Sequence, residues 1–246
     1  MALAPPMHGT SLCAACAFNE MNLCGAVLKK DQSDASLHPA ASQLILSTQT
    51  LPARRIISHP KEWSEDAFVI CNGWAASSIG LPDGRRQILA LLLPGDLVFT
   101  DGLFEPMSRR SVEAISEVTY RKFNRARFKD LILEHPELLE KFGKIWNEER
   151  ARADELTLAL GRRKSDERIA RLILDLAERL AKRGMMTGQT MEFPLRQRHI
   201  ADATGLTTVH VSKVLGEFQR AGLIDISVRS LTISNITGLR WIVGPR

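Results

Sequence analysis

The chain has 246 residues, a length that favours two modules over one. Its 44% hydrophobic and 25% charged residues are an ordinary globular composition, which excludes wholesale disorder, collagen and disulfide-dense scaffolds. The net charge of +5 is unevenly divided, because from residue 162 onward 15 Lys and Arg accompany 8 Asp and Glu, a balance of +7 that leaves −2 for the residues before. A basic C-terminal module favours nucleic-acid binding, since phosphate neutralisation drives affinity; a solvated basic surface is the alternative.

The N-terminus and the apolar runs indicate where the protein works. The first ten residues have neither the positive region nor the long apolar stretch of a secretory signal. No run approaches the roughly 20 apolar residues that span a bilayer. We therefore expect a cytoplasmic protein with no membrane partner, whose four cysteines are thiols or metal ligands rather than disulfides.

The first half of the chain combines a cysteine-rich segment with a series of strands. Residues 1–30 are poor in charge and contain three of the four cysteines. Apolar runs over 67–76 and 87–93 then flank a Leu-Pro-Asp-Gly turn at 81–84, and a third run covers 112–123. No helix-length segment separates these runs, so we expect an antiparallel β-roll or barrel rather than βαβ units.

A long helical pattern follows, opened by Pro136 and extending over about 25 residues. Glu149 and Ala153 occupy the middle of its apolar face, where a coiled-coil seam prefers larger apolar side chains. We interpret it as a dimerisation helix with a weak centre; a helix packed on its own β-roll is the alternative. The expected dimer contacts are Phe142, Ile145, Glu149, Ala153, Leu156 and Leu160.

The last third of the chain gives the clearest pattern. Apolar residues three and four apart predict an amphipathic helix over 166–183. Two shorter helices over 195–203 and 207–221 flank a turn at Gly205, which is the punctuation of a helix-turn-helix. Two short strands around Arg229 would form a wing.

Three segments, in this order, resemble the CRP/FNR family of bacterial transcription regulators. RQRHIADATGLTTVHVSKVLGEFQRAGLI looks like its winged helix-turn-helix, LPDGRRQILALLLPGDLV like the hairpin and GD turn of its β-roll, and KSDERIARLILDLAERL like the helix entering its DNA-binding domain. The resemblance implies an α+β fold and a homodimer on palindromic double-stranded DNA, with RNA polymerase as a partner of an activator. The expected domains are a cysteine-rich sensor segment (1–30), a cyclic-nucleotide-binding-like antiparallel β-roll (31–130), a long dimerisation helix (131–164) and a C-terminal winged helix-turn-helix (165–246).

Three N-terminal cysteines have a spacing suited to one metal centre. Cys13, Cys16 and Cys24 follow C-x2-C-x7-C, in which two thiolates of one turn and a third from a loop can bind together. The spacing, with Gly25 after Cys24, is similar to that of the alphaproteobacterial oxygen-sensing branch of the family. That resemblance implies a [4Fe-4S] cluster that oxygen destroys.

The fourth ligand of such a cluster is open. The position of the family's fourth cysteine aligns with Tyr120, which leaves Cys71 as the other candidate, with a small buried core residue as its alternative interpretation. Zinc held by three thiolates and His8, or an iron-sulfur site completed by Tyr120 or a carboxylate, also stays open. Redox-active thiols without metal and a vestigial site are the remaining alternatives.

The β-roll lacks part of the family's nucleotide-binding set. Relatives hold ribose with a glutamate after the GD turn and phosphate with an arginine-serine pair. Arg110-Ser111 matches that pair, but Thr100 stands at the glutamate position. Ala153-Asp154 aligns with the polar pair that touches the purine, and Asp154 would repel an anion. We therefore do not expect cyclic AMP, and a different small anion stays open.

The second helix of the helix-turn-helix is expected to enter the major groove, where it would present Thr208, Val209, His210, Ser212 and Lys213. The oxygen-sensing branch reads its half-site with a glutamate, a serine and an arginine, which match Val209, Ser212 and Lys213 here. Lys213 can donate to guanine and Val209 can contact a thymine methyl, so we expect a related but different half-site. The expected phosphate contacts are Arg196, Arg198, His199, Thr207 and Arg229.

The sequence thus predicts a homodimeric DNA-binding transcription regulator whose N-terminal cysteines report oxygen or redox state. The alternatives are a constitutively DNA-binding regulator with a structural zinc or vestigial cysteine site, and a regulator that senses a small anion in the β-roll. No P-loop, GxSxG or HExxH motif occurs, and the six histidines show no metal or nucleophile spacing. We therefore do not expect an enzyme.

Overall fold

The computed structural model describes residues 45–98 and 107–244. Six residues singled out above lie outside this part of the chain, namely His8, Cys13, Cys16, Cys24, Gly25 and Thr100. Among the described residues, no helix has the length and apolar character needed to cross a membrane.

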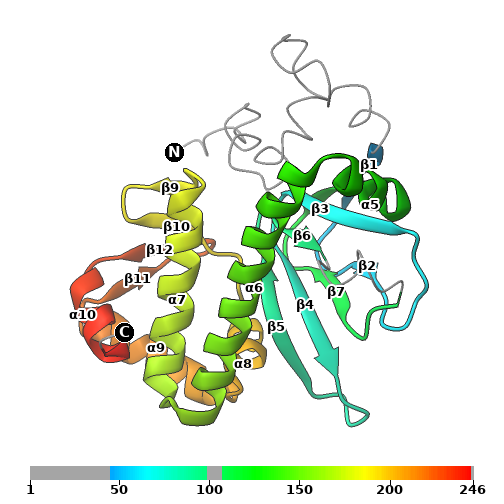
Figure 1. Ribbon diagram of the computed structural model, residues 1–246. Helices are drawn as coiled ribbons and strands as arrows, with labels where there is room; N and C mark the ends of the chain where they lie inside the picture. The colour runs from blue at the N-terminus through cyan, green and yellow to red at the C-terminus, as the bar shows by residue number, and fades with distance from the viewer. Residues whose placement is uncertain (1–44, 99–106, 245–246) are drawn as a thin grey trace.

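Two antiparallel four-stranded sheets form the first half of the described chain (Figure 1). The first has the order β1-β8-β3-β6, with β1 at Ile45–Leu51, β8 at Val118–Asn124, β3 at Asp66–Asn72 and β6 at Leu97–Val98. The second has the order β2-β7-β4-β5, with β2 at Ile56–Ser58, β7 at Ser111–Ala114, β4 at Ala75–Gly80 and β5 at Arg86–Leu92. They confirm the expected β-roll, and β4 pairs with β5 across the predicted turn.

Two runs expected to be single strands are pairs of strands in different sheets. The run 67–76 turns at Gly73 and passes from β3 to β4, and the run 112–123 divides into β7 and β8. Gly73 has a φ of +78°, and a Cβ there would collide with the carbonyl oxygen of Glu117, so the crossing requires glycine. Because β3 and β4 are both largely buried, the apolar pattern alone could not show where one sheet ends.

Three helices follow the β-roll: α5 (Arg125–Glu134), α6 (Pro136–Arg162) and α7 (Ser165–Lys182). The predicted long helix is confirmed as the 27 residues of α6, which begins at a proline. Phe128 of α5 and Phe142 of α6 have ring centroids 6.2 Å apart and hold the start of α6 on the roll. Arg163 and Lys164 take extended backbone conformations, so α6 and α7 are separate helices with a bend between them.

The C-terminal part is a winged helix-turn-helix. Its elements are β9 (Met186–Thr187), β10 (Thr190–Glu192), α8 (Gln197–Thr204), α9 (Thr208–Arg220), β11 (Ile224–Ile226), β12 (Ser230–Ile233) and α10 (Ile236–Val243). The strands form a sheet of order β11-β12-β10-β9. The two helices, the turn and the wing confirm the sequence pattern, whereas β9, β10 and α10 were not predicted. These three elements have two, three and eight residues, too few for an apolar period to show.

One hydrophobic cluster crosses from the β-roll into the DNA-binding part. Trp74 and Ile88 of the roll belong to the same buried cluster as Ile173 of α7 and Ile200 of α8. Figure 1 shows α8 against the start of β5, with α6 and α7 running past the same sheet. The helix-turn-helix therefore shares a core with the roll of its own chain, which a domain on a free linker would not do.

Candidate DNA-binding surface and sensor residues

The recognition helix α9 has one buried face and one exposed face. Its N-cap Thr207 accepts a hydrogen bond from the backbone N–H of His210 at 3.3 Å. The buried face consists of Val211, Val214, Leu215 and Phe218, which pack into the core. On the other face Val209 is 75% exposed. An apolar side chain this exposed at the start of a helix is typical of a surface that becomes covered when a partner binds.

An open hollow marks this exposed face. Gln197 of α8 lines it together with four predicted base-reading residues, Thr208, Val209, Ser212 and Lys213. The fifth, His210, lies on the exposed surface with its Nδ1 2.9 Å from the Thr207 hydroxyl. The structure thus gathers four of the five at one place.

Gln197 is the residue of this surface that we did not predict. It is the first residue of α8, and its side chain reaches the hollow from the helix before the recognition helix. Its amide offers both a donor and an acceptor to a nucleic acid. The available signal was its place at the expected start of the first helix, where backbone N–H groups also favour phosphate.

The prediction that His199 contacts phosphate is wrong. His199 is only 3% exposed, and the backbone N–H of Arg196 donates to its Nδ1 at 3.1 Å. The Arg198 Nε lies 3.2 Å from Nε2, so N–H donors face both ring nitrogens. Burial and then the positive charge of Arg198 lower the pKa of His199 to about 4. The ring is therefore neutral near pH 7. From its buried position it accepts a hydrogen bond from the backbone N–H of Arg196, at the start of α8.

The other expected phosphate contacts lie on the surface. Arg196, Arg198 and Thr207 are exposed beside the N-termini of α8 and α9. Arg229 is exposed at the wing, where its Nη2 lies 3.2 Å from Oε1 of Glu192. This ion pair aligns the guanidinium at the edge of the sheet while leaving it open to water.

The dimer contacts expected on α6 differ in what they can offer a partner. Phe142 is 1% exposed and packs within its own chain, so the prediction is wrong for this residue. Ala153 is exposed, and the rest of the set is half-buried: Ile145, Glu149, Leu156 and Leu160. Trp146 adds a large apolar side chain, 49% exposed, one turn after Phe142. Among the expected contacts, the accessible ones therefore begin at Ile145, after Phe142.

Two candidate metal ligands lie in the described sheet. Cys71 is half-buried at an irregularity of β3, with its Sγ 3.8 Å from the carbonyl oxygen of Val69. Tyr120 is buried and donates from its hydroxyl to Oε1 of Gln49 at 2.6 Å, and burial raises its pKa. A phenol must lose its proton to bind iron or zinc well, so this environment disfavours Tyr120 as a ligand. In the described ranges, no three His, Cys, Asp or Glu side chains gather as a metal site would require.

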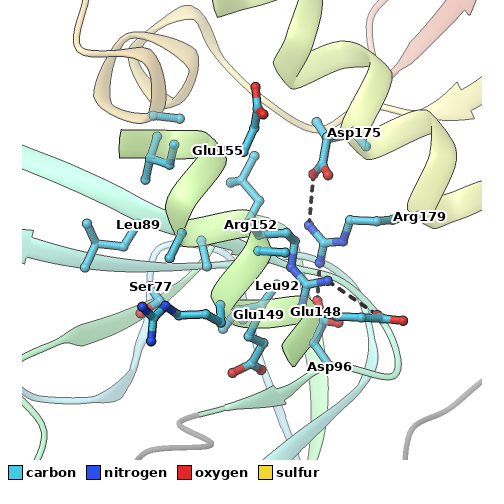
Figure 2. Close-up of a pocket in the computed structure, with 18 of the residues that line it drawn as sticks. Ser77, Leu89, Leu92, Asp96, Glu148, Glu149, Arg152, Glu155, Asp175 and Arg179 are labelled. Atoms are coloured by element: carbon cyan, nitrogen blue, oxygen red, sulfur yellow. Dashed lines mark hydrogen bonds and ion pairs between the residues drawn. The ribbon is translucent and has the colours of Figure 1, made fainter. Parts of the chain in front are cut away.

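A cavity of about 1090 Å³ lies between the roll, α6 and α7. Arg110 and Ser77 line it on the roll side, and the buried Ser77 hydroxyl has no hydrogen-bond partner among the described residues. Figure 2 shows Arg179 reaching from α7 to Asp96 of the roll and to Asp175 of its own helix. Polar groups therefore line the boundary between the roll and the DNA-binding part.

Comparisons with known proteins match both halves of the chain. Residues 48–135 match the cyclic nucleotide-binding domain, and residues 167–242 match the Crp-like helix-turn-helix domain. The nitrogen fixation regulation protein FixK of Bradyrhizobium diazoefficiens is 37% identical over 59% of this chain and 60% of its own length. The transcriptional activatory protein AadR of Rhodopseudomonas palustris is 31% identical over 86% of this chain and 84% of its own.

A solved structure agrees with these sequence matches. FixK2 from Bradyrhizobium japonicum superimposes with a TM-score of 0.74 at 25% identity, covering 81% of this chain and 98% of that chain. The matched regions include the β-roll, the helix-turn-helix and the order in which they follow one another. The chain belongs to the CRP/FNR family of transcription regulators.

Proposed function

We propose that the chain acts as a homodimer that binds palindromic double-stranded DNA through α9 and the wing, and that its N-terminal cysteines make this binding respond to oxygen. The observation that carries the DNA-binding part is the hollow on α9, where Val209 and Lys213 are exposed beside the N-terminus of α8. This surface belongs to a module with a net charge of +7. An exposed helix face with flanking arginines is what a major groove and its phosphates require.

The residues of the hollow suggest separate roles. Lys213 donates to guanine as a point charge, and Val209 contacts a thymine methyl. Arg196, Arg198 and Arg229 bind phosphates and hold the register without reading sequence.

The dimer would form along α6. A helix of 27 residues is about 40 Å long, enough to carry a seam while its two DNA-binding domains reach half-sites about 34 Å apart. Leu156→Glu would place a carboxylate at that seam, so we expect monomers that keep the thermal stability of each folded chain. Sedimentation measures the outcome, and an unchanged dimer would reject α6 as the interface.

The oxygen response would depend on an iron-sulfur cluster held by Cys13, Cys16 and Cys24, with Cys71 as the candidate fourth ligand. Such a cluster, when bound, would link the cysteines to one another, and oxygen would break that link. Twenty residues separate Cys24 from the start of β1, which is ample chain to bring the three thiols to any edge of the first sheet. This length of chain permits the arrangement, and the three main ligands lie outside the described residues.

One preparation tests both parts of this proposal. The chain is purified without oxygen, analysed for iron, sulfide and zinc, and used to select duplexes from a randomised library. We expect iron and sulfide in equal amounts, selection of a palindrome, and loss of DNA binding after exposure to air. Equal binding before and after air would favour the constitutive regulator, and zinc in place of iron would favour the structural site.

A second candidate function is suggested by Ser77. Its hydroxyl, which has no hydrogen-bond partner among the described residues, and Arg110 both line the cavity between the roll, α6 and α7, a pair that could hold a small anion. Calorimetric titration with cyclic nucleotides and with inorganic phosphate tests this, using Arg110→Ala as the control. Binding that disappears in the variant would support the anion sensor.

A further inference from the structure

Two clusters of ionic side chains flank β5 and join the roll to the DNA-binding domain. At one end, Asp96 follows the strand and meets Arg179 and Arg183 of the α7 region. At the other end, Arg86 begins the strand and meets Asp202 of α8. The roll therefore holds the helix-turn-helix domain through two separate ionic clusters, in addition to the hydrophobic cluster that the two share.

The Asp96 cluster is buried. Asp96 is 8% exposed, and each of its carboxylate oxygens accepts from one guanidinium at 2.5 Å. The backbone N–H of Leu93 donates to the same carboxylate at 2.8 Å, and Arg183 also donates to the carbonyl oxygen of Pro94 at 2.7 Å. Three donors on one buried carboxylate fix its position, and with it the end of α7.

The Arg86 cluster holds α8. Arg86 donates from Nε to Asp202 at 2.7 Å and from Nη1 to Glu113 at 2.5 Å, so one guanidinium bridges a roll carboxylate and a domain carboxylate. The next residue, Gln87, donates from its amide to the carbonyl oxygen of Ala203 at 3.2 Å. Because α8 packs on α9, a fixed α8 also fixes the recognition helix.

A third attachment lies at the bend between α6 and α7. Arg168 donates to the carbonyl oxygens of Leu160 at 3.0 Å and Arg163 at 2.9 Å, which end α6, and to that of Thr204 at 3.1 Å, which ends α8. One guanidinium thus caps two helices. Without the two ionic clusters, this point and the shared hydrophobic cluster would leave the domain freer to rotate, because apolar contacts are not directional.

We propose that Asp202 and Arg183 are positioning residues for DNA recognition: their contacts to the roll fix the angle of α9 relative to α6 and so select one spacing between half-sites. This inference rests on the proposed dimeric DNA binding. The two clusters lie at opposite ends of a seven-residue strand, about 20 Å apart, so together they resist rotation far better than either does alone.

The test removes the Asp202 contact and one of the two arginine contacts to Asp96, since Arg179 stays in place, and compares a control with the same charge changes. The variant is Asp202→Asn with Arg183→Gln. The control is Asp225→Asn with Lys182→Gln, because Asp225 is exposed and the side chain of Lys182 is 68% exposed and pairs with Glu178 of its own helix. Both full-length proteins lose one carboxylate and one cation from the same domain, so their net charges remain equal.

The readout is the dependence of affinity on half-site spacing. The palindrome selected by the wild-type chain is rebuilt with its centre lengthened or shortened by about one and two base pairs, since each base pair turns one half-site by roughly 36°. We expect the wild type and the control to lose more than about tenfold in affinity at the first step, and the variant to lose less than about threefold. Single half-site binding should be the same in all three, which a general loss of folding would not give.

The outcomes separate the inference from the function on which it rests. If the wild type selects no palindrome, the proposed function fails. If it does and the double variant keeps the full spacing preference, the inference is overturned. If the double variant unfolds, Asp202→Asn alone decides, because that ion pair is one-quarter exposed and its loss leaves the buried cluster intact; an unchanged preference there rejects the inference too.

Discussion

The DNA-binding domain carries two sets of arginines that differ in burial. Arg196, Arg198 and Arg229 are exposed around the recognition helix, whereas Arg179 and Arg183 turn inward to the carboxylate of Asp96. Each arginine of either set adds one positive charge to the total of +7 counted from the sequence. The surface that a phosphate meets is therefore less positive than the count indicates, because part of the charge neutralises a carboxylate of the roll.

The acidic partners of these arginines, Glu192 and Asp96, differ in burial in the same way. Glu192 lies beside Arg229 at the wing, where both side chains are solvated. Asp96 is enclosed, and although burial opposes its ionised form, the charges of Arg179 and Arg183 hold its pKa below the usual value. An exposed ion pair contributes little to stability, whereas removing one partner of a buried cluster leaves uncompensated charge.

The largest expected effect comes from breaking the buried cluster. Asp96→Ala leaves two guanidiniums facing each other and an unsatisfied N–H on Leu93, so we expect a loss of about 3–5 kcal/mol in the free energy of unfolding. Glu192→Ala, the matched change at the exposed pair, should cost less than about 1 kcal/mol. Urea unfolding of both variants measures the difference, and similar costs would mean that Asp96 is solvated.

The buried histidine should make stability depend on acidity. With a folded-state pKa of about 4 against an ordinary value of 6.5, His199 takes up a proton more readily in the unfolded chain. Its effect is absent near pH 7, grows as the pH falls below 6.5, and is complete below about pH 4, where it has removed roughly 2–4 kcal/mol. His199→Gln should flatten the unfolding free energy between pH 6.5 and 4, and an unchanged slope would contradict the assigned burial.

Local signals predicted most of the DNA-binding domain. Gly205 takes a left-handed φ of +65° at the end of α8, and a Cβ there would approach Leu160 of α6, so the glycine that marked the turn also permits the close contact of two helices. The spacing of apolar residues predicted α7, and Pro136 predicted the start of α6. These features depend on residues that are close together in the sequence.

What the sequence could not predict depends on distant partners. Nothing near His199 indicates that its ring is enclosed, since it directly follows the basic stretch Arg196-Gln197-Arg198. Phe142 fits the period of a dimer seam but packs on Phe128 in its own chain, and an apolar side chain shows no preference between a partner and its own fold. The contact between Arg86 and Asp202 joins residues 116 positions apart, beyond any local pattern.

A smaller effect should distinguish two exposed residues, Lys213 and Arg229, by the kind of DNA contact that each one makes. Lys213→Ala removes a donor to one base, so we expect about 1–3 kcal/mol less discrimination at one position of the half-site. Arg229→Ala should weaken all sequences alike and reduce the salt slope of binding by about one. Titrations on specific and random duplexes at several salt concentrations measure both. Parallel losses in the two variants would contradict the distinction between reading and positioning.

The smallest expected effect concerns Cys71. Strand β1 begins at Ile45, which is level with Ala67 through Phe123 of β8, whereas Cys71 lies near the opposite end of the sheet, level with Gln49 and Thr50 of β1. A half-buried thiol at that end is better suited to the roll than to the cluster. We therefore expect Cys71→Ser to cost about 1 kcal/mol of stability and leave iron and sulfide per chain unchanged.

Cys16→Ser provides the comparison, because Cys16 belongs to the three-cysteine set that the proposed cluster requires. Both variants are reconstituted without oxygen, and iron and sulfide are quantified per chain. Loss in Cys16→Ser alone would leave the fourth position to a group other than Cys71. Parallel loss in the two would make Cys71 the fourth ligand, which would require the three N-terminal thiols to lie near Thr50 rather than near Ile45.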